Sequence, residues 1–409
     1  MFWIYDIFIQ LLIFGMKCFA VFNTKARLGV DGRKSSLAIV KKTFTSEDKV
    51  IWMHAASLGE YEQGLPVLER LKQKYPDSKI LVSFFSPSGL EHVKKKKHIA
   101  DALCYLPYDR KSEVSEFCQQ FQIQLFFTVK YDYWYRLFEV LKQKKAPIYV
   151  VSALFYEKQV FFKPFGSFFV NRLRKDVDCF FHQTQHSVDL AKSVGLQQSI
   201  LAGDTRFARV KSNVEHFSEL AYISDFIKER EVLVVGSSWE SEEKIVRLLQ
   251  VQQNKVKIIL APHDLKRIPG MLKIFSNHCL YSELKQNPSL GENKDLLIID
   301  NIGMLSKLYH YADVALVGGG FHSAGLHNIL EAAAFGVPVV IGNKYRKNPE
   351  ADELIRVKGG FSCSTEEEAA SFIHQLFQDK ASRTQYAKNA HDFIYNQENA
   401  VDIIMQNIN

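Results

Sequence analysis

The chain has few cysteines, and none stands in a pattern that would serve metal or redox chemistry. Its 409 residues include 6 cysteines, and no two of them form a Cys-x-x-Cys pair. Of the 13 histidines, only His182 and His186 stand as a His-x-x-x-His pair, and without the glutamate of a His-Glu-x-x-His motif we expect no metal site. We expect the cysteines to be reduced, buried thiols of a cytosolic compartment, and we expect neither a metal nor a cofactor.

Two phosphate-binding fingerprints are also missing. No G-x-x-x-x-G-K-[ST] sequence occurs, and the strand-like run "EVLVVG" continues as "SSWESEE" and not as G-x-G-x-x-G. A P-loop nucleotide site and a dinucleotide-binding Rossmann fingerprint are therefore excluded. No motif that reads RNA or DNA is present, so we expect no nucleic-acid partner. The net charge of +7 is mild and suits an acidic small substrate or an anionic membrane surface.

What is present describes an ordered, two-domain protein. Hydrophobic residues make up 47% of the chain and charged residues 24%, which is the composition of a globular protein. The length is too great for one compact core and suits two α/β domains.

The N-terminus carries the longest apolar run, "MFWIYDIFIQLLIFGMKCFAVF". Only Asp6, Gln10 and Lys17 interrupt it strongly, and as a helix it would be roughly 33 Å long, enough to cross a bilayer core. It shows no clear basic leader and no clear small-x-small exit, so we do not expect a cleaved signal peptide. We expect a membrane anchor, and the alternative is a buried or interfacial helix that never spans. Basic residues at and after its end predict a cytoplasmic location for the rest of the chain by the positive-inside rule: Lys17, Lys25, Arg27, Arg33 and Lys34.

After this segment, short β-branched or aromatic runs alternate with helical stretches. Runs such as "KVIWMHAA", "KILVSFFS" and "PIYVVSALF" predict parallel strands joined by right-handed crossovers. The alternation stops at a charged helical stretch and then restarts at "EVLVVGSS". The predicted organisation is an anchor at 1–22, a first doubly wound domain at 31–205, a linker at 206–230, a second doubly wound domain at 231–380 and a helical tail at 381–409 that packs on either domain.

Two doubly wound α/β domains predict a deep cleft between them. Ligands of such sheets bind outside the carboxyl ends of the strands, so the loops at those ends are the candidate site. In the second domain the loop of "LIIDNIGML" offers Asp300 or Asn301 as a helix N-cap. Gly303 in this loop would let the first helical amides approach an anion closely. An ordinarily capped helix is the alternative explanation of that loop.

Two further loops of the second domain supply polar groups. In "GLHNILEAAAFG", Asn328 and Glu331 are spaced i, i+3 at the opening of a helix, so both should point to one face. A carboxylate there can accept two hydroxyl hydrogen bonds, as a ribose diol offers, although helix capping is an alternative role. In "APHDLKRI", Pro262 and His263 end a strand, and the imidazole can donate to a phosphate or stack on a base. Three such loops favour a nucleotide site built late in the domain, as in glycosyltransferases of the GT-B architecture.

In the first domain, "HAASLGE" places one carboxylate, Glu60, just after a strand. Ser57 and Gly59 are small and leave room in front of it. Because Pro66 suits a helix's first turn and not its interior, we expect Glu60 to lie in the turn before the helix. The alternative is a first-turn acid that only complements the helix dipole.

The motifs together resemble one family. "HAASLGE", "GDTRF", "VGSSWESEE", "APHDLKRI", "DNIGML" and "GGGFHSAGLHNILEAAAFGVPVVIG" resemble the 3-deoxy-D-manno-octulosonic acid (Kdo) transferases of lipopolysaccharide synthesis over nearly the whole chain. The resemblance implies a GT-B enzyme that transfers Kdo with inversion from CMP-β-Kdo to the lipid A precursor, at the cytoplasmic face of the inner membrane.

The resemblance also implies the roles of the site residues. Glu60 matches the catalytic base, which takes the acceptor proton during in-line attack. The residues that match the CMP site are Pro262, His263, Ile302, Gly303, Met304, Asn328, Ile329, Leu330 and Glu331. The leaving phosphate would meet backbone amides at Gly303, so the reaction would need no divalent metal.

This chain departs from the family at several positions. Where many members have M-E-T-E-L-W, it has "VKYDYW", with Lys130 and Asp132 at the positions of two acids. His263 stands where an arginine is common, and Met304 replaces an acid. These changes leave the acceptor contacts and the number of Kdo units open.

Three other functions compete with Kdo transfer. A transferase of the same fold that uses a UDP-sugar and a lipid-linked acceptor is the nearest. A UDP-sugar 2-epimerase shares the architecture but would lack the anchor, and a non-catalytic nucleotide-binding scaffold would not need Glu60.

Overall fold

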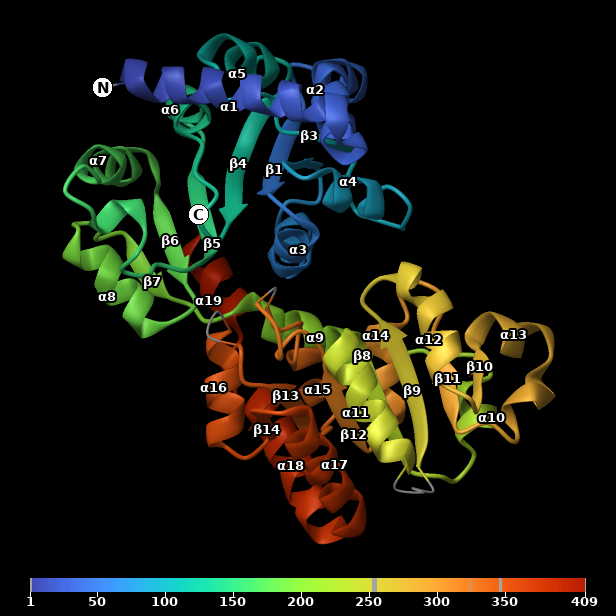
Figure 1. Cartoon of the computed structure of the whole chain (residues 1–409). Coiled ribbons are helices and arrows are strands. Elements are labelled where there is room, and N and C mark those ends of the chain that lie inside the picture. The colour runs from blue at the N-terminus through green and yellow to red at the C-terminus, as the bar shows by residue number, and fades with distance from the viewer. Residues whose placement is uncertain (1, 252–255, 324, 346–347, 409) are drawn as a thin grey trace. The chain divides into compact units, whose positions relative to one another are not determined.

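The computed structural model describes residues 2–251, 256–323, 325–345 and 348–408 (Figure 1). The chain divides into two compact units. Unit 1 contains Met1–Arg209 and Glu398–Asn409, and unit 2 contains Val210–Gln397. Each unit is built on one seven-stranded parallel sheet, so the predicted α/β class with two doubly wound sheets is confirmed.

Unit 1 holds a sheet in the order β3-β2-β1-β4-β5-β6-β7. Its strands are β1 (Lys49–Ala55), β2 (Lys79–Phe84), β3 (Ala102–Tyr105), β4 (Gln122–Val129), β5 (Ile148–Ala153), β6 (Cys179–His182) and β7 (Ser199–Leu201). The central strands are buried along nearly their whole length because helices cover both faces of a parallel sheet. This explains why their sequences are nearly continuous apolar runs without alternation.

The helices of unit 1 connect successive strands and cover the sheet. They are α1 (Phe2–Phe22), α2 (Thr24–Thr43), α3 (Leu58–Lys74), α4 (Pro87–Val93), α5 (Lys111–Cys118), α6 (Tyr135–Gln143), η1 (Val160–Phe162), α7 (Ser167–Asp176), α8 (Gln185–Ser193) and α19 (Ala400–Asn407). Helix α9 (Thr205–Glu215) runs across the boundary between the units. The predicted linker at 206–230 is thus largely helical.

Helix α1 is the predicted anchor segment. Its residues Trp3–Phe22 have a mean hydropathy of 1.8, so the helix is long and apolar enough to cross a membrane. One side of it nevertheless packs onto unit 1, where Tyr5, Ile9 and Ile13 join the hydrophobic core that contains Trp52 and Phe138.

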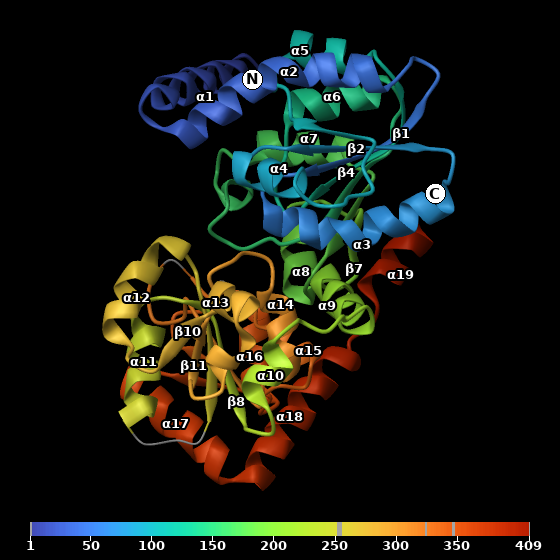
Figure 2. The same ribbon diagram turned by 90° about the vertical axis from the view of Figure 1, so that its right-hand side faces the viewer.

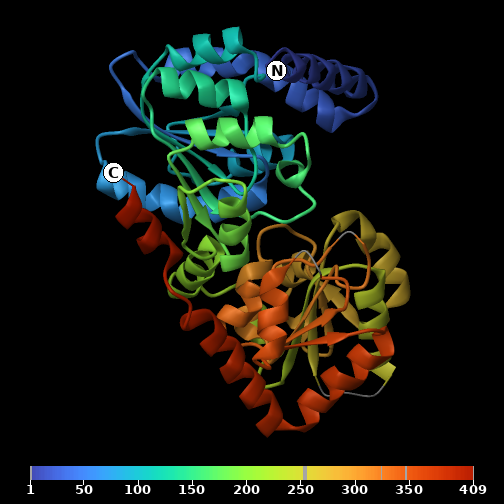
Figure 3. The same ribbon diagram turned by 90° about the vertical axis from the view of Figure 1, so that its left-hand side faces the viewer.

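Unit 2 holds a sheet in the order β10-β11-β9-β8-β12-β13-β14. Its strands are β8 (Val232–Ser238), β9 (Lys257–Pro262), β10 (His278–Leu280), β11 (Leu296–Ile298), β12 (Val314–Val317), β13 (Val339–Gly342) and β14 (Gly360–Cys363). Its helices are α10 (Ile223–Ile227), α11 (Glu240–Val251), η2 (Leu265–Arg267), α12 (Ile268–Ile274), α13 (Tyr281–Gln286), η3 (Pro288–Gly291), α14 (Leu305–Leu308), η4 (Tyr309–Tyr311), α15 (Leu330–Ala334), α16 (Pro349–Arg356), α17 (Glu366–Gln378) and α18 (Lys380–Tyr395). Helices α11 and α17 pack together over one face of the sheet (Figure 3).

The predicted C-terminal tail is shared between the units. Helix α18 belongs to unit 2, whereas α19 belongs to unit 1 and lies along α3 (Figure 2). Lys74 Nζ donates to the carbonyl of Ile408 at 2.6 Å, and Arg70 pairs with Asp402 at 2.9 Å.

All six cysteines are free thiols, as expected from their spacing. Five are buried as expected, but the expectation is wrong for Cys18, which is exposed on α1.

Candidate active site

The strand order of unit 1 reverses between β1 and β4. Strands β2 and β3 follow on one side of β1, and strands β5 to β7 follow on the other side of β4. A doubly wound sheet binds its ligand at the carboxyl ends of the strands at such a reversal. The loops after β1 and β4, which contain Glu60 and Asp132, are therefore the candidate site of this unit.

Glu60 lies in the first turn of α3, half-buried, and the predicted turn position is wrong. The helix begins at Leu58, and Pro66 lies inside it. Ser57, two residues after the end of β1, is the N-cap of α3 and has an extended backbone with φ −141°. Pro66 lacks an N–H to donate to the carbonyl of Glu62 four residues earlier; both residues are half-buried, so water can reach this part of the helix.

The carboxylate of Glu60 accepts a hydrogen bond from a neighbouring serine. Ser57 Oγ donates to Glu60 Oε2 at 2.5 Å. This hydrogen bond orients the carboxylate, and in the described part of the chain no donor reaches Oε1. Gly59 is exposed, and of the atoms around it a Cβ there would come within 4 Å of Ser57 Oγ alone, at 3.9 Å.

A hydrogen-bond relay runs from the core of unit 1 to Asp132. Trp52 Nε1 donates to Ser83 Oγ at 2.8 Å, and Ser83 Oγ lies 2.9 Å from His54 Nδ1. His54 Nε2 lies 2.6 Å from Asp132 Oδ2. Because a carboxylate only accepts, His54 donates through Nε2. Its Nδ1 lies 2.9 Å from the hydroxyl and 3.0 Å from the carbonyl oxygen of Ser83. The relay satisfies the fully buried imidazole and fixes Asp132, whose side chain is 22% exposed.

The loop after β4 also stores backbone strain. Lys130 adopts φ +64°, a left-handed conformation that residues other than glycine rarely take. The hydroxyl of Thr128 donates to the carbonyl of Asp132 at 3.1 Å, and Tyr133 Oη donates to the carbonyl of Lys130 at 3.1 Å. The tight turn thus presents Asp132 at the end of the strand.

In unit 2 the strand order reverses between β8 and β12, and one buried acid connects the two loops there. Glu242 is fully buried and accepts from the backbone N–H of Trp239 at 2.8 Å and of Gly319 at 3.1 Å. Burial raises the pKa of this carboxyl. Gly319 has φ +91°, and a Cβ there would lie 2.2 Å from the carbonyl oxygen of Gly325, so the glycine run is required for this loop.

Aromatic and imidazole rings gather at the same end of the sheet. The ring of Trp239 stacks on His263 at 4.4 Å, and His263 lies 4.7 Å from the ring of His327. His322 meets the edge of Trp239 at 4.6 Å. Burial, together with the nearby His263 and His322, lowers the pKa of His327 to about 4. His327 is therefore a neutral imidazole at neutral pH, able to donate one hydrogen bond and accept another.

The loop before α14 differs from its predicted form. Helix α14 has four residues and begins after Met304, and its predicted N-caps Asp300 and Asn301 lie well before it. Asp300 instead accepts from the backbone N–H of Ser282 at 3.0 Å. Gly303 has φ +98° and is exposed, so it turns the chain outside the helix. Ile302 is exposed as well, and Met304 is buried.

The predicted contact between Asn328 and Glu331 is present. Asn328 Nδ2 donates to Glu331 Oε1 at 3.1 Å, and Asn328 Oδ1 accepts from the N–H of Leu330 at 3.1 Å. Helix α15 begins at Leu330, so Asn328 precedes the helix and only Glu331 lies in its first turn; Ile329 and Leu330 are buried. Pro262 ends β9 and is followed by exposed His263. The structure thus brings His263 close to His327, the neighbour of Asn328.

Three buried polar atoms at this edge of the sheet have no hydrogen-bond partner among the described residues. They are Oγ of Ser238, the last residue of β8, Nε1 of Trp239 just after it, and Oδ1 of Asn301 after β11. Buried polar atoms are nearly always satisfied in folded proteins. Their position at the carboxyl ends of the strands is that of groups which a bound polar ligand would satisfy.

Sequence reasoning missed several residues of this arrangement. His54, Trp239, Glu242 and His327 stood inside quoted motifs but received no role. The tryptophan directly after a strand in "VGSSWESEE" was the one local signal available. No group of three His, Cys, Asp or Glu side chains that could hold a metal ion occurs within the described ranges.

The sequence of this chain is similar to those of known transferases. Residues 25–209 match the family model described as 3-deoxy-D-manno-octulosonic-acid transferase (kdotransferase). A 3-deoxy-D-manno-octulosonic acid transferase of Aquifex aeolicus is 26% identical over 84% of this chain and 91% of that protein. One from Haemophilus influenzae is 23% identical over 87% of this chain and 85% of that protein.

The fold of both units resembles that of a solved structure. The UDP-GlcNAc 2-epimerase of Neisseria meningitidis, bound to UDP-GlcNAc, superposes with a TM-score of 0.59 at 15% identity. The match covers 87% of this chain and 98% of that one. At this identity the likeness concerns the fold.

The paired seven-stranded sheets, with polar residues at their carboxyl ends, define a protein of the GT-B architecture. Within that class the chain is similar to Kdo transferases: residues 25–209 match their family model, and the two curated transferases above are 26% and 23% identical to it over most of its length. The resemblance noted from the motifs is confirmed.

Proposed function

We propose that the chain transfers Kdo from CMP-β-Kdo to a hydroxyl of the lipid A precursor, with inversion at the anomeric carbon. The acceptor oxygen attacks that carbon as its proton passes to Glu60, and the bond to the phosphate oxygen breaks to release CMP. The proposal is supported by the kinship with Kdo transferases along most of the chain.

The observation that carries the mechanism is the position of Glu60. It lies after β1, at the strand-order reversal of unit 1, with Ser57 holding Oε2. Oε1 is then the atom that takes the acceptor proton. Asp132, held by His54, ends the neighbouring strand of the same reversal, and we assign it to contacts with acceptor hydroxyls.

In unit 2 the nucleotide site comprises the loops after β9, β11 and β12. We assign the ribose hydroxyls to Glu331, whose carboxylate Asn328 orients at 3.1 Å. The imidazoles of His263 and His327 supply hydrogen-bond donors to the phosphate. Backbone amides around Gly303 complement the charge that develops on the leaving group. The remaining lining residues are Pro262, Ile302, Met304, Ile329 and Leu330.

We also propose that α1 attaches the protein to the cytoplasmic face of the inner membrane, where the lipid acceptor resides. The support is the length and apolar character of Trp3–Phe22 and the basic residues that follow it.

The test is transfer of Kdo to a lipid A precursor in detergent without added metal. Wild type is compared with Glu60→Gln and with Glu62→Gln, which changes an acid two residues away that pairs with Arg209 at 2.9 Å. We expect Glu60→Gln to lose about 10²- to 10⁴-fold in rate, as for a general base, while CMP binding persists and Glu62→Gln stays near wild type. Equal rates in all three proteins would disprove the role of Glu60. Transfer by wild type from a UDP-sugar and not from CMP-Kdo would disprove the donor.

A further inference from the structure

Helix α1 has two faces with different surroundings. Tyr5, Ile9 and Ile13 recur at intervals of four residues and are 7%, 2% and 2% exposed, because they pack into the core of unit 1. Residues four apart lie on the same side of a helix. The inner face of α1 is thus a structural part of the unit along at least two turns.

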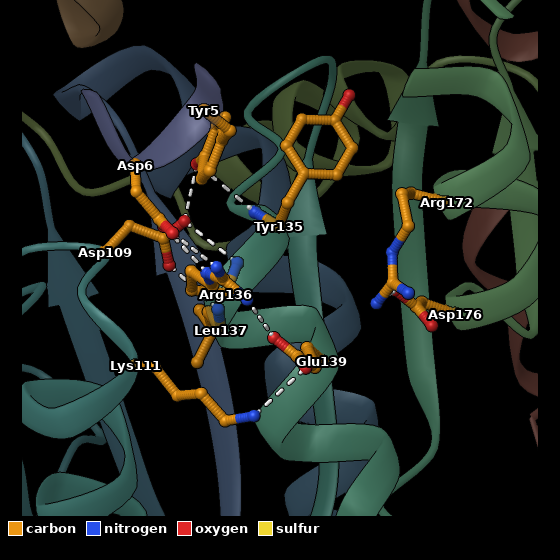
Figure 4. Close-up of polar contacts among 10 residues, drawn as sticks. All are labelled: Tyr5, Asp6, Asp109, Lys111, Tyr135, Arg136, Leu137, Glu139, Arg172 and Asp176. Atoms are coloured by element: carbon orange, nitrogen blue, oxygen red, sulfur yellow. Dashed lines mark hydrogen bonds and ion pairs between the residues drawn. The ribbon is translucent and has the colours of Figure 1, made fainter. Parts of the chain in front are cut away.

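A buried carboxylate holds the first turn of α1. Tyr5 Oη donates to Asp109 Oδ2 at 2.5 Å, and the Tyr5 ring meets Tyr135 edge-on at 5.3 Å (Figure 4). Asp109 also accepts from the backbone N–H groups of Arg136 and Leu137 at 2.9 and 2.8 Å. The residue is only 3% exposed. The two carboxylate oxygens of Asp109 therefore cap the start of α6 and also bind Tyr5 of α1.

A bidentate ion pair holds the neighbouring residue. Arg136 Nε donates to Asp6 Oδ1 at 2.8 Å, and its terminal nitrogen donates to Oδ2 at 2.5 Å (Figure 4). The Arg136 side chain is 11% exposed and also contacts Glu139 at 2.7 Å. We call the contacts of Tyr5 and Asp6 with Asp109 and Arg136 the α1 clip.

The outer face of α1 is apolar and open. Its exposed large hydrophobic residues are Trp3, Ile4, Ile7, Phe8, Leu11, Phe14, Phe19, Val21 and Phe22. Contiguous exposed apolar surface of this kind marks an interaction site. Lys17, Lys25 and Arg27 are exposed near the end of α1 and the start of α2, and they complement anionic headgroups.

We propose that α1 lies in the plane of the bilayer surface and does not cross it. Its outer face enters the acyl region to the depth of an amphipathic interfacial helix, about 5–10 Å, while the clip keeps its inner face on unit 1. The inference rests on the membrane association proposed above. The in-plane orientation follows from the clip. A helix that crossed the membrane would break the clip, so Asp109 would lose the hydrogen bond from Tyr5 and the charged Asp6 would move toward the hydrocarbon.

The test measures which leaflet each part of α1 reaches. In a Cys18→Ser background, where the remaining native cysteines are buried, Trp3→Cys, Leu11→Cys and Phe14→Cys are each labelled with NBD. The full-length proteins are added to vesicles of phosphatidylethanolamine and phosphatidylglycerol, and dithionite, which does not cross bilayers, is then added outside. Lipids with quenchers at the headgroup and at mid-chain report depth. We expect dithionite to reduce all three labels to the same extent, at one shallow depth.

Three outcomes would contradict the proposal, and they differ from one another. Protection of the label at residue 3 with the label at residue 11 at mid-bilayer would show a spanning helix, and membrane association would stand. No binding to vesicles would refute the membrane association as well. A dimer in solution, with the labels buried before vesicles are added, would assign the outer face to a second copy of the chain.

A second pair of variants tests the clip itself. Asp6→Asn removes the charge that Arg136 binds, and Asp31→Asn removes an acid from the exposed Asp31–Lys34 pair on α2 as the matched control. With a spin label at residue 3 and no vesicles, we expect greater mobility in Asp6→Asn than in Asp31→Asn. Equal mobility would refute the clip as the element that fixes α1.

Discussion

Glu242 offers the sharpest test of the site in unit 2. Its carboxylate joins the loop after β8 to the glycine loop after β12 through the N–H groups of Trp239 and Gly319. Glu242→Gln keeps the size of the side chain but leaves one acceptor oxygen. The amide NH₂ must then face one of the two backbone N–H groups, donor against donor.

The expected change in the free energy of unfolding combines the hydrogen bond that the substitution removes and the buried charge that it also removes. A hydrogen bond to a charged group contributes about 1.5–3 kcal/mol, and an unsatisfied buried N–H costs about 1–3 kcal/mol. Removing a fully buried charge recovers part of this loss. We expect the free energy of unfolding of unit 2 to fall by about 2 kcal/mol. CMP affinity should fall by up to roughly 30-fold, because the loops must be re-ordered on binding.

Hydrogen exchange with peptide resolution measures the two units separately, and calorimetric titration with CMP measures affinity. Glu240→Gln is the control, since Glu240 lies two residues away on the same helix, is 88% exposed and pairs with Arg267 at 3.3 Å. It should change stability by less than about 0.5 kcal/mol. Equal protection of β8 and β12 and equal CMP affinity in both variants would show that the bridge does not hold the two loops.

Two further predictions concern burial and close packing. Burial lowers the pKa of fully buried His182 to about 4; its contribution to the stability of unit 1 is present above pH 6.5 and is lost as the pH falls toward 4. The loss between pH 7 and pH 5 is about 2 kcal/mol, which exchange at both pH values would detect, and His182→Asn should flatten this dependence. In unit 2, a Cβ at Gly236 would lie 2.0 Å from Tyr309 Oη, so Gly236→Ala should cost about 1–3 kcal/mol. In a double-mutant cycle, adding Tyr309→Phe should restore part of the lost free energy of unfolding. If the losses of the two single variants simply add, the clash with Tyr309 is not the cause.

The sheets were predictable from sequence because burial on both faces leaves a local mark. Runs such as "KILVSFF" in β2 and "VLVV" in β8 are apolar without alternation, and both form central strands. The contact of Asn328 with Glu331 was predictable for the same reason, since it depends on residues three apart. Glycine and proline were less reliable guides: Pro66 lies inside α3, and Gly303 turns the chain before α14.

No local sequence pattern predicted the long-range contacts. The relay from Trp52 through Ser83 and His54 to Asp132 joins three elements, and only the folded sheet brings them together. The apolar stripe of Tyr5, Ile9 and Ile13 has the same composition as a lipid-facing helix. Its packing on unit 1 therefore depends on partners more than a hundred residues away, such as Asp109 and Tyr135.

The C-terminal helix α19 belongs to unit 1 although it follows unit 2 in the sequence, and this has a consequence for biosynthesis. Val401, Ile404 and Ile408 pack into the core of unit 1, yet the ribosome makes them only after all of unit 2. At about 5–20 residues per second, the nascent first unit waits on the order of ten seconds or more with that side of α3 uncovered. For the finished protein, one proteolytic nick between Arg209 and Val210 would not release unit 1, because α19 stays embedded in it and remains covalently joined to unit 2.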